Sequence, residues 1–261
     1  MKKYLVIGNP IEHSLSPKLH NYWIKKNKID AIYDKKLINE VDIENIISQV
    51  EKEHIHGINV TVPFKQKVIP FVDELTSEAN ESQSINTIYK ENNKVIGHNT
   101  DMAGFELGLR YVNYNVKNKK IFILGAGGVV SSIILVLKKM GASQIILSNR
   151  TKKKAEELKK SFSYLEIIDW GEIPEFDMII NATSLGLKKN DEIKLNYIDI
   201  GTNKFFYGVI YNPKQTFFLK RAKMFENKAE NGKMMFIYQA QLAFKIWHNI
   251  LPKINENLLN S

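Results

Sequence analysis

The segment from Lys119 to Arg150 constrains the fold more than any other part of this chain. An apolar run, Ile121–Leu124, leads directly into a glycine-rich turn, Gly125–Gly128, and then into a helical apolar stretch, Val129–Met140. A second apolar run, Gln144–Leu147, follows. Strand, turn, helix and strand in this order form a βαβ unit with parallel strands. Free N–H groups and the positive dipole end at the helix N-terminus bind phosphate groups. The segment therefore predicts an α/β fold with a phosphate-binding turn.

The end of the second strand indicates which dinucleotide binds there. The glycine turn alone is weak evidence, because Val130 stands where G-x-G-x-x-G/A has its third small residue. NAD-binding units usually have Asp or Glu after the second strand, whereas this chain has Asn149-Arg150-Thr151 and then Lys152–Lys154. A carboxylate would repel a 2′-phosphate, but an Arg fork and a Lys attract one. We therefore expect NADP(H); the alternative is a basic first turn on a solvated helix.

Composition excludes several other classes of protein. The chain has 261 residues, 44% of them hydrophobic, enough for one large or two modest domains. Its net charge of +9 comes mostly from lysine, and few arginines are present to read bases in nucleic acid. A basic enzyme with an anionic small-molecule substrate is the simpler account. There is no cysteine, and the histidines lack metal-ligand spacing, so we expect no disulfide and no metal site.

No targeting or membrane segment is expected. The N-terminal apolar run, Tyr4–Ile7, is too short for a secretory signal, and Gly8-Asn9-Pro10 ends it. No apolar stretch approaches the roughly 20 residues that span a bilayer. We expect a cytoplasmic protein, monomeric or homodimeric, without nucleic-acid or membrane partners.

Strand and helix patterns alternate on both sides of the βαβ unit. The first hundred residues contain strand patterns at Tyr4–Ile7, Ala31–Ile38 and Gly57–Val62, helices opened by Ser16-Pro17 and capped by Asp42, and a hairpin turning at Asn92-Asn93. A linking helix is predicted over about 102–112, with further strands at 165–168, 178–180 and 207–210. An amphipathic tail helix over 233–249 needs an apolar surface, and we expect it to pack on the first domain. The predicted domains are 1–101 with about 233–261, a mostly parallel sheet with a small antiparallel addition, and 102–232, a second parallel sheet.

Polar residues beside these strands can carry chemistry. Ser14 and Ser16, at a strand-to-helix turn, can both donate to one small carboxylate, although a helix cap with a solvent-facing serine is the plainer alternative. Lys65 follows a strand and a proline turn, and is either a solvated lysine or a proton donor. Asp101 is either an N-cap or a partner of Lys65. Hydride transfer to a ketone leaves an alkoxide that needs a proton, which a Lys ammonium held by a carboxylate can supply.

Further polar groups follow later strands, where open α/β sheets bind their ligands. These groups are Asn181–Gly186, Tyr211–Pro213, Asn231-Gly232 and Gln239.

The chain resembles the shikimate dehydrogenase family, whose members reduce 3-dehydroshikimate with NADPH. The likeness covers nearly the whole length, and the family's motifs stand in order at Gly8–Asn21, Asn59–Lys65, Asn86-Thr87, Gly97–Asp101, Gly125–Gly128, Asn149–Thr151, Asn181–Gly186 and Tyr211–Pro213. The resemblance implies two α/β domains around a cleft: an N-terminal substrate domain and a Rossmann-like NADP domain, with the C-terminal helix returning to the first.

The resemblance also implies roles for individual residues. Lys65 and Asp101 are expected to be the catalytic pair. The expected substrate-binding residues are Ser14, Ser16, Asn59, Thr61, Asn86, Tyr211 and Gln239. The expected cofactor-binding residues are Gly125, Ala126, Gly127, Gly128, Asn149, Arg150, Thr151, Lys154, Thr183 and Gly232. The implied function is NADPH-dependent shikimate dehydrogenase, in aromatic amino-acid biosynthesis.

Two alternatives remain at this stage: a quinate/shikimate dehydrogenase that uses NAD, and an inactive relative that binds a metabolite. The basic residues at Asn149–Thr151 oppose the first, and the presence of Lys65 and Asp101 opposes the second. The chain departs from the family pattern at Gln83-Ser84, Met102, Val129-Val130 and Gly208. None of these departures affects the expected catalytic pair.

Overall fold

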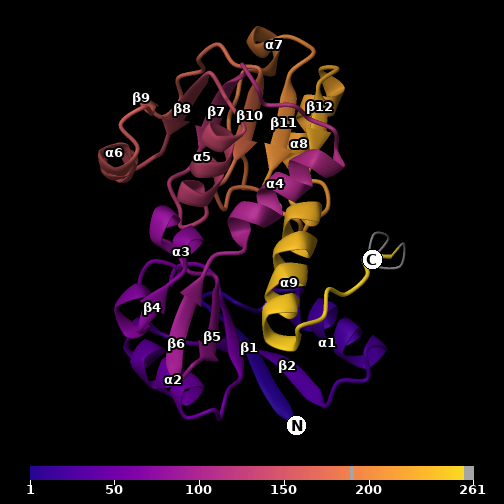
Figure 1. Ribbon diagram of the computed structural model, residues 1–261. Helices are drawn as coiled ribbons and strands as arrows, with labels where there is room; N and C mark the ends of the chain where they lie inside the picture. Colours follow the sequence, from indigo (N-terminus) through magenta and orange to yellow (C-terminus); the bar gives the residue numbers. More distant parts are fainter. Residues whose placement is uncertain (189–190, 256–261) are drawn as a thin grey trace. The chain divides into compact units, whose positions relative to one another are not determined.

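The computed structural model describes residues 1–188 and 191–255, and it divides into two compact units (Figure 1). The first unit is Met1–Gly104 with the described chain from Ile237 onward, and the second is Phe105–Phe236. Both boundaries fall inside helices, α4 (Asp101–Tyr111) and α9 (Lys233–His248). They lie a few residues beyond the positions predicted from the sequence.

The first unit is built on a six-stranded sheet in the order β2-β1-β3-β5-β6-β4. The strands are β1 (Lys2–Gly8), β2 (Ala31–Leu37), β3 (Gly57–Val60), β4 (Glu74–Leu75), β5 (Thr87–Glu91) and β6 (Lys94–His98). Strand β1 pairs in parallel with β2 and β3, and the β5–β6 hairpin joins β3 in antiparallel fashion. Asn92 and Asn93 form the hairpin turn with φ of 49° and 62°, which asparagine tolerates. The predicted sheet with its antiparallel addition is confirmed.

Helices cover both faces of this sheet because its inner strands β1 and β3 bury residues on both sides. The helices are α1 (Ser16–Lys26), α2 (Ile43–Glu51) and α3 (Ser77–Ser82), with 3₁₀ turns at Glu40–Asp42 and Ile69–Phe71. Helix α2 packs its isoleucines into a core with Ile7 and Ile58. On the other face, Trp247 of α9 packs against Tyr4, and its indole N–H donates to the Ile88 carbonyl at 3.3 Å. The tail helix therefore returns to the first unit, as predicted.

Two predicted helix caps are wrong. Helix α1 begins at Ser16 itself, and its N-cap position is Leu15, which has no capping side chain. The Ser14 hydroxyl instead accepts from the Ser16 N–H at 3.3 Å. Asp42 occupies the N-cap position of α2, but its carboxylate accepts from the Asn39 N–H at 2.8 Å and so caps the preceding 3₁₀ turn. Strand β3 is also shorter than predicted, because the chain turns where the Phe64 N–H donates to the Thr61 carbonyl.

The second unit is built on a six-stranded parallel sheet in the order β12-β11-β10-β7-β8-β9. Its strands are β7 (Lys120–Leu124), β8 (Gln144–Ser148), β9 (Glu166–Ile168), β10 (Met178–Asn181), β11 (Phe205–Gly208) and β12 (Lys228–Glu230). Its helices are α5 (Val130–Lys139), α6 (Lys152–Ser161), α7 (Tyr197–Ile200) and α8 (Phe217–Met224). The βαβ unit is therefore confirmed as β7–α5–β8. Strand β11 begins two residues before the predicted run, and β12 and α8 were not predicted.

Successive side chains along these strands point to opposite faces of the sheet, and this explains why helices lie on both faces. Phe122 and Phe206 belong to a core shared with Phe218 of α8. On the opposite face, Tyr207 meets Phe105 of α4 edge-on, with ring centroids 5.5 Å apart. Because all six strands run in parallel, their carboxyl ends share one edge. Within the described residues, no helix is both long and apolar enough to cross a membrane.

Candidate active site and cofactor-binding turn

In the first unit, the motif residues lie together along one edge of the sheet, the edge at which strands β1 and β3 end. Strands β1 and β3 run in parallel, so the loop carrying Ser14 and the turn carrying Thr61 leave the sheet at the same end. Thr87 begins β5 and lies opposite both Asn59 of β3 and His98 of β6. Four strands thus bring motifs far apart in sequence to one edge, where loops carry function on a rigid support.

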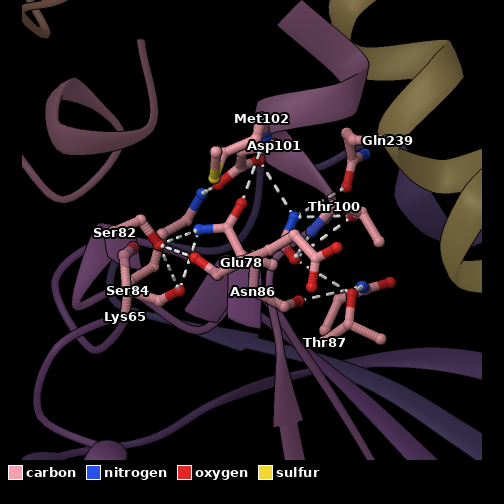
Figure 2. A network of polar contacts seen from close by, with 12 residues as sticks. Lys65, Glu78, Ser82, Ser84, Asn86, Thr87, Thr100, Asp101, Met102 and Gln239 are labelled. Atoms are coloured by element: carbon pink, nitrogen blue, oxygen red, sulfur yellow. Dashed lines mark hydrogen bonds and ion pairs between the residues drawn. The ribbon is translucent and has the colours of Figure 1, made fainter. Parts of the chain in front are cut away.

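Lys65 and Asp101 form an ion pair at this edge, between Nζ and Oδ2. The two side chains are only 11% and 6% exposed. Breaking such a pair leaves an uncompensated buried charge, so each group holds the other in place. Helix α4 starts with Asp101, yet the carboxylate points to Lys65 instead of serving as a cap (Figure 2).

Asn86 holds the second oxygen of this carboxylate. Its side-chain Nδ2 donates to Asp101 Oδ1 at 2.9 Å, and also reaches Thr100 Oγ1 at 2.9 Å and Gln239 Oε1 at 3.3 Å (Figure 2). Its Oδ1 accepts from the Thr100 backbone N–H at 2.8 Å. Asn86 is 2% exposed, so its amide is fixed in this orientation. The Asp101 carboxylate is therefore held from two sides, by Lys65 and by Asn86.

Asn99 ties the start of α4 to the rest of the site, a function that sequence reasoning did not assign. Its Oδ1 accepts from the Met102 N–H at 3.1 Å, and its Nδ2 donates to the Ser84 carbonyl at 2.8 Å and to Ser82 Oγ at 3.0 Å. Lys65 is tied to the same segment, because its carbonyl accepts from the Ile85 N–H at 2.8 Å. Asn99 lies in the Gly97–Asp101 motif, so the sequence pointed to this residue. Its role was missed because its side-chain amide bonds to Ser82 and Ser84, which lie in another segment of the chain.

The two serines and Thr61 lie at the loops next to this network. Ser16 is buried and Ser14 is half-buried. A Cβ on Gly8 would lie 2.5 Å from Thr61 Cγ2, so only glycine lets the β1 loop approach Thr61 this closely. Gln239 joins the network from α9, within the first unit. The structure therefore brings Asn59, Lys65, Asn86, Asp101 and Gln239 into one hydrogen-bonded group.

In the second unit, the glycine turn after β7 has the backbone of a phosphate cradle. Gly125 adopts φ of +110°, and a Cβ there would lie 2.9 Å from the Ala182 carbonyl oxygen. A Cβ on Gly127 would meet nothing within 4 Å, so the backbone is open on that side. Helix α5 follows with no capping side chain and no acidic residue in its first turn. An uncapped helix N-terminus of this kind suits a pyrophosphate.

The connection from β8 to α6 supplies the expected basic residues. Asn149 Oδ1 accepts from the Ala126 N–H at 3.1 Å, and its Nδ2 donates to the Thr151 carbonyl at 2.9 Å, so Asn149 joins the two turns. Arg150 and Lys154 are exposed, and their side chains have no partner among the described residues. Lys152 is instead paired with Asp169 at 2.6 Å. Among the described residues, Arg150 and Lys154 thus have no partner, whereas Lys152 has an exposed one.

The remaining expected residues lie at other carboxyl ends of the same sheet. Thr183 follows β10, where Asn181 fixes its hydroxyl at 2.7 Å, and Thr183 Cγ2 lies 3.0 Å from the Cβ position of Gly125. Gly232 follows β12, and a Cβ there would lie 2.1 Å from the Val209 carbonyl oxygen. Tyr211 stacks on Phe236 with ring centroids 4.1 Å apart. Tyr211, expected to bind substrate, therefore belongs to the second unit.

The departures from the family pattern are accommodated. Gln83 adopts a left-handed φ of 48° at the C-terminus of α3, a conformation that glycine adopts more readily. Val130 is fully buried as the first residue of α5. A Cβ on Gly208 would have its nearest neighbour at 3.5 Å, so this position has room for a side chain.

Comparisons with known proteins show which family the chain resembles over its whole length. The sequence family described as "Shikimate dehydrogenase substrate binding domain" matches residues 6–88, and "Shikimate / quinate 5-dehydrogenase" matches residues 106–190. The shikimate dehydrogenase (NADP(+)) of Pelagibacter ubique (strain HTCC1062) is 62% identical over 99% of this chain and 98% of its own length.

Solved structures give the same result. A shikimate dehydrogenase in complex with NADP+ has a TM-score of 0.91 at 33% identity, covering 100% of this chain and 94% of that one. The shikimate 5-dehydrogenase of Thermus thermophilus, in complex with NADP(H) and shikimate, has a TM-score of 0.88 at 27% identity, covering 97% and 95%. The chain belongs to the shikimate dehydrogenase family.

Proposed function

We propose that Lys65 and Asp101 are the acid–base pair with which this chain interconverts 3-dehydroshikimate and shikimate. Family membership makes the chain an NADP-dependent shikimate dehydrogenase, an oxidoreductase. The observation that carries the residue assignment is the buried Lys65–Asp101 ion pair, placed where four strands bring polar motifs together. Buried charges of this kind cluster at functional sites.

The lysine moves the proton. The cofactor, when bound, supplies or accepts the hydride. In reduction, Lys65 Nζ gives a proton to the carbonyl oxygen that becomes the hydroxyl, and in oxidation it takes that proton back. Asp101 keeps the lysine side chain in place through the buried ion pair. Because both groups are buried, water screens their interaction little.

The polar residues around the pair orient the substrate. Ser14 and Ser16 are proposed to donate to its carboxylate, a charge-assisted contact that sets the ring's direction. Thr61, Asn86 and Gln239 are proposed to bind its hydroxyl groups and carbonyl region. Holding a small ring in one pose lowers the barrier because the reacting atoms no longer have to find their geometry.

The residues of the second unit fit NADP(H), a dinucleotide that carries an additional 2′-phosphate. The open backbone at Gly127 and the uncapped N-terminus of α5 suit the pyrophosphate, with Gly125, Ala126 and Gly128 in the same turn. Asn149, Arg150, Thr151 and Lys154 are proposed to hold the 2′-phosphate, and Thr183 and Gly232 to line the rest of the cofactor site. The Arg fork gives the bidentate phosphate contact that NAD could not use.

Replacing the lysine tests the assignment. We expect Lys65→Ala to lower kcat for shikimate oxidation with NADP+ by about 10²- to 10⁴-fold, the usual contribution of a positioned acid, with little change in KM. Lys67→Ala is the matched control, because Lys67 lies two residues further on and forms an exposed pair with Glu40. That variant should keep the kcat of the unchanged protein. Normal turnover by Lys65→Ala would remove the lysine from the mechanism, and an inactive unchanged protein would favour a metabolite-binding relative.

A further inference from the structure

A continuous line of hydrogen bonds runs from the edge of the first sheet to the catalytic carboxylate. The Tyr33 hydroxyl on β2 donates to Asn59 Oδ1 at 2.7 Å. Asn59 Nδ2 donates to Thr87 Oγ1 at 3.1 Å, and the Thr87 hydroxyl donates to Asn86 Oδ1 at 3.0 Å. Asn86 Nδ2 then donates to Asp101 Oδ1 at 2.9 Å. Each group accepts from the one before and donates to the one after.

All members of this line are buried, so water does not compete with it. Tyr33, Asn59, Thr87 and Asn86 are 1%, 6%, 0% and 2% exposed. Hydrogen bonds aligned head to tail in a low dielectric polarise one another. Every donor in this line points towards Asp101, whose negative charge is the terminal acceptor. The line therefore holds the carboxylate in one position.

Asn59 has no donor to spare for a substrate. One Nδ2 hydrogen serves Thr87 Oγ1 and the other serves the Asn86 carbonyl at 3.0 Å. The second contact fixes the backbone of Asn86, and the first fixes its side chain through Thr87. The Asn86 carbonyl can only accept, so it fixes the nitrogen side of the Asn59 amide, and the Tyr33 hydroxyl donates to the oxygen side. The ring of Tyr33 is in turn stacked on His20, with centroids 4.1 Å apart and planes at 6°.

We propose that Tyr33 is a positioning residue for the acid–base pair, acting on Asp101 through the hydrogen-bond chain Asn59–Thr87–Asn86. Tyr33 touches neither substrate nor cofactor in this account. Asn59 likewise acts by holding Asn86 and not as a substrate ligand. The proposal rests on the catalytic role proposed for Lys65 and Asp101.

Removing single hydroxyl groups tests this chain. We expect Tyr33→Phe to lower kcat for shikimate oxidation about three- to tenfold, the equivalent of one hydrogen bond, while KM for shikimate and for NADP+ changes little. Thr87→Val should lower kcat by a similar factor, and Thr87→Ser, which keeps the hydroxyl, should retain it. In Tyr33→Phe/Thr87→Val, kcat should match the lower of the two single variants, because one chain is broken twice.

Tyr4→Phe is the matched control. Tyr4 is 1% exposed and packs in the same aromatic cluster, and its hydroxyl has no hydrogen-bond partner among the described residues. This variant should keep the kcat of the unchanged protein. Melting temperatures of all variants separate lost positioning from lost folding, and the Thr87→Ser and Thr87→Val pair decides the matter even if Tyr33→Phe folds poorly.

Three results would overturn the proposal: a kcat for Tyr33→Phe equal to that of Tyr4→Phe, losses that multiply in the double variant, or a loss confined to KM. The proposed function fails separately, through normal turnover by Lys65→Ala. If Lys65→Ala is inactive and Tyr33→Phe is unaffected, only the hydrogen-bond chain is wrong.

Discussion

At the scale of residues, the site depends on polar groups that are buried and satisfied. Lys65 and Asp101 neutralise each other, and Asn86 and Asn99 use their amides to fix the loops that carry them. A buried polar network with every member bonded is rigid, whereas a half-satisfied one is costly. Outside this network, His20 is fully buried, and its two ring nitrogens have no partner among the described residues.

His20 should make the protein sensitive to mild acid. Burial lowers the pKa of His20 to about 3, from 6.5 for a free histidine. Between these pH values the unfolded chain binds a proton at His20 and the folded chain does not. His20 therefore lowers the stability of the folded state as pH falls below 6.5. Between pH 7 and pH 5 this contribution is about 2 kcal/mol.

The variant His20→Phe isolates that effect, because phenylalanine can stack on Tyr33 and cannot be protonated. We expect its free energy of unfolding to fall less between pH 7 and pH 5 than that of the unchanged protein, by about 2 kcal/mol. Chemical denaturation at both pH values measures this difference. Identical pH dependence in the two proteins would show that His20 does not titrate on unfolding in this range.

The sequence allowed candidate catalytic residues to be named but not their supports. Lys65 and Asp101 were candidates because the chemistry needs an acid and a charged partner, and the family resemblance singled them out as the expected pair. Nothing in the sequence pointed to Tyr33, since a tyrosine in a strand is ordinarily a packing residue. Its hydroxyl meets Asn59 only because β2 and β3 lie on either side of β1. Such contacts depend on sheet order, which sequence patterns do not give.

At the scale of elements, strand ends decide where function lies. In the second unit, the turns after β7, β8 and β10 carry the glycines, the basic residues and Thr183 to one edge of a parallel sheet. Long, strongly apolar strands and the glycine turn were predictable from the sequence. Strands β4 and β12 were not, because β4 has only two residues and β12 has a single apolar residue, Ala229, between two charged ones. The caps of α1 and α2 were mispredicted because the polar side chains expected to cap them form hydrogen bonds within the preceding turns.

The turn from β8 to α6 should set the choice of cofactor. We expect Arg150→Ala to raise KM for NADP+ about tenfold or more and to leave KM for NAD+ nearly unchanged, because only NADP+ has the 2′-phosphate for a charge-assisted pair. Arg110→Ala is the matched control, since Arg110 is exposed and pairs with Glu106 within α4. Steady-state kinetics with both cofactors measures the effect. Equal losses for the two cofactors would contradict the 2′-phosphate role.

At the scale of the whole molecule, the N-terminal part of the chain forms most of the first unit, and the middle part forms the second. The C-terminal helix then contributes to the first unit again. The return depends on Trp247, which lies so close to Gly57 that a Cβ there would be 2.3 Å from its indole nitrogen. The amphipathic tail predicted this return, because its apolar side needed a surface. Fold class, both sheets and the returning helix were thus within reach of the sequence, whereas the exact unit boundaries fell inside continuous helices, where no composition change marks them.

The proposed mechanism requires Lys65 and Asp101 to work as one acid–base unit. The most direct measurement is kcat for shikimate oxidation with NADP+ in Lys65→Ala, in Asp101→Ala and in the double variant. Groups that act as a unit are not additive, so we predict that the double variant is about as slow as the slower single variant. Losses that multiply in the double variant would contradict a shared proton-transfer role.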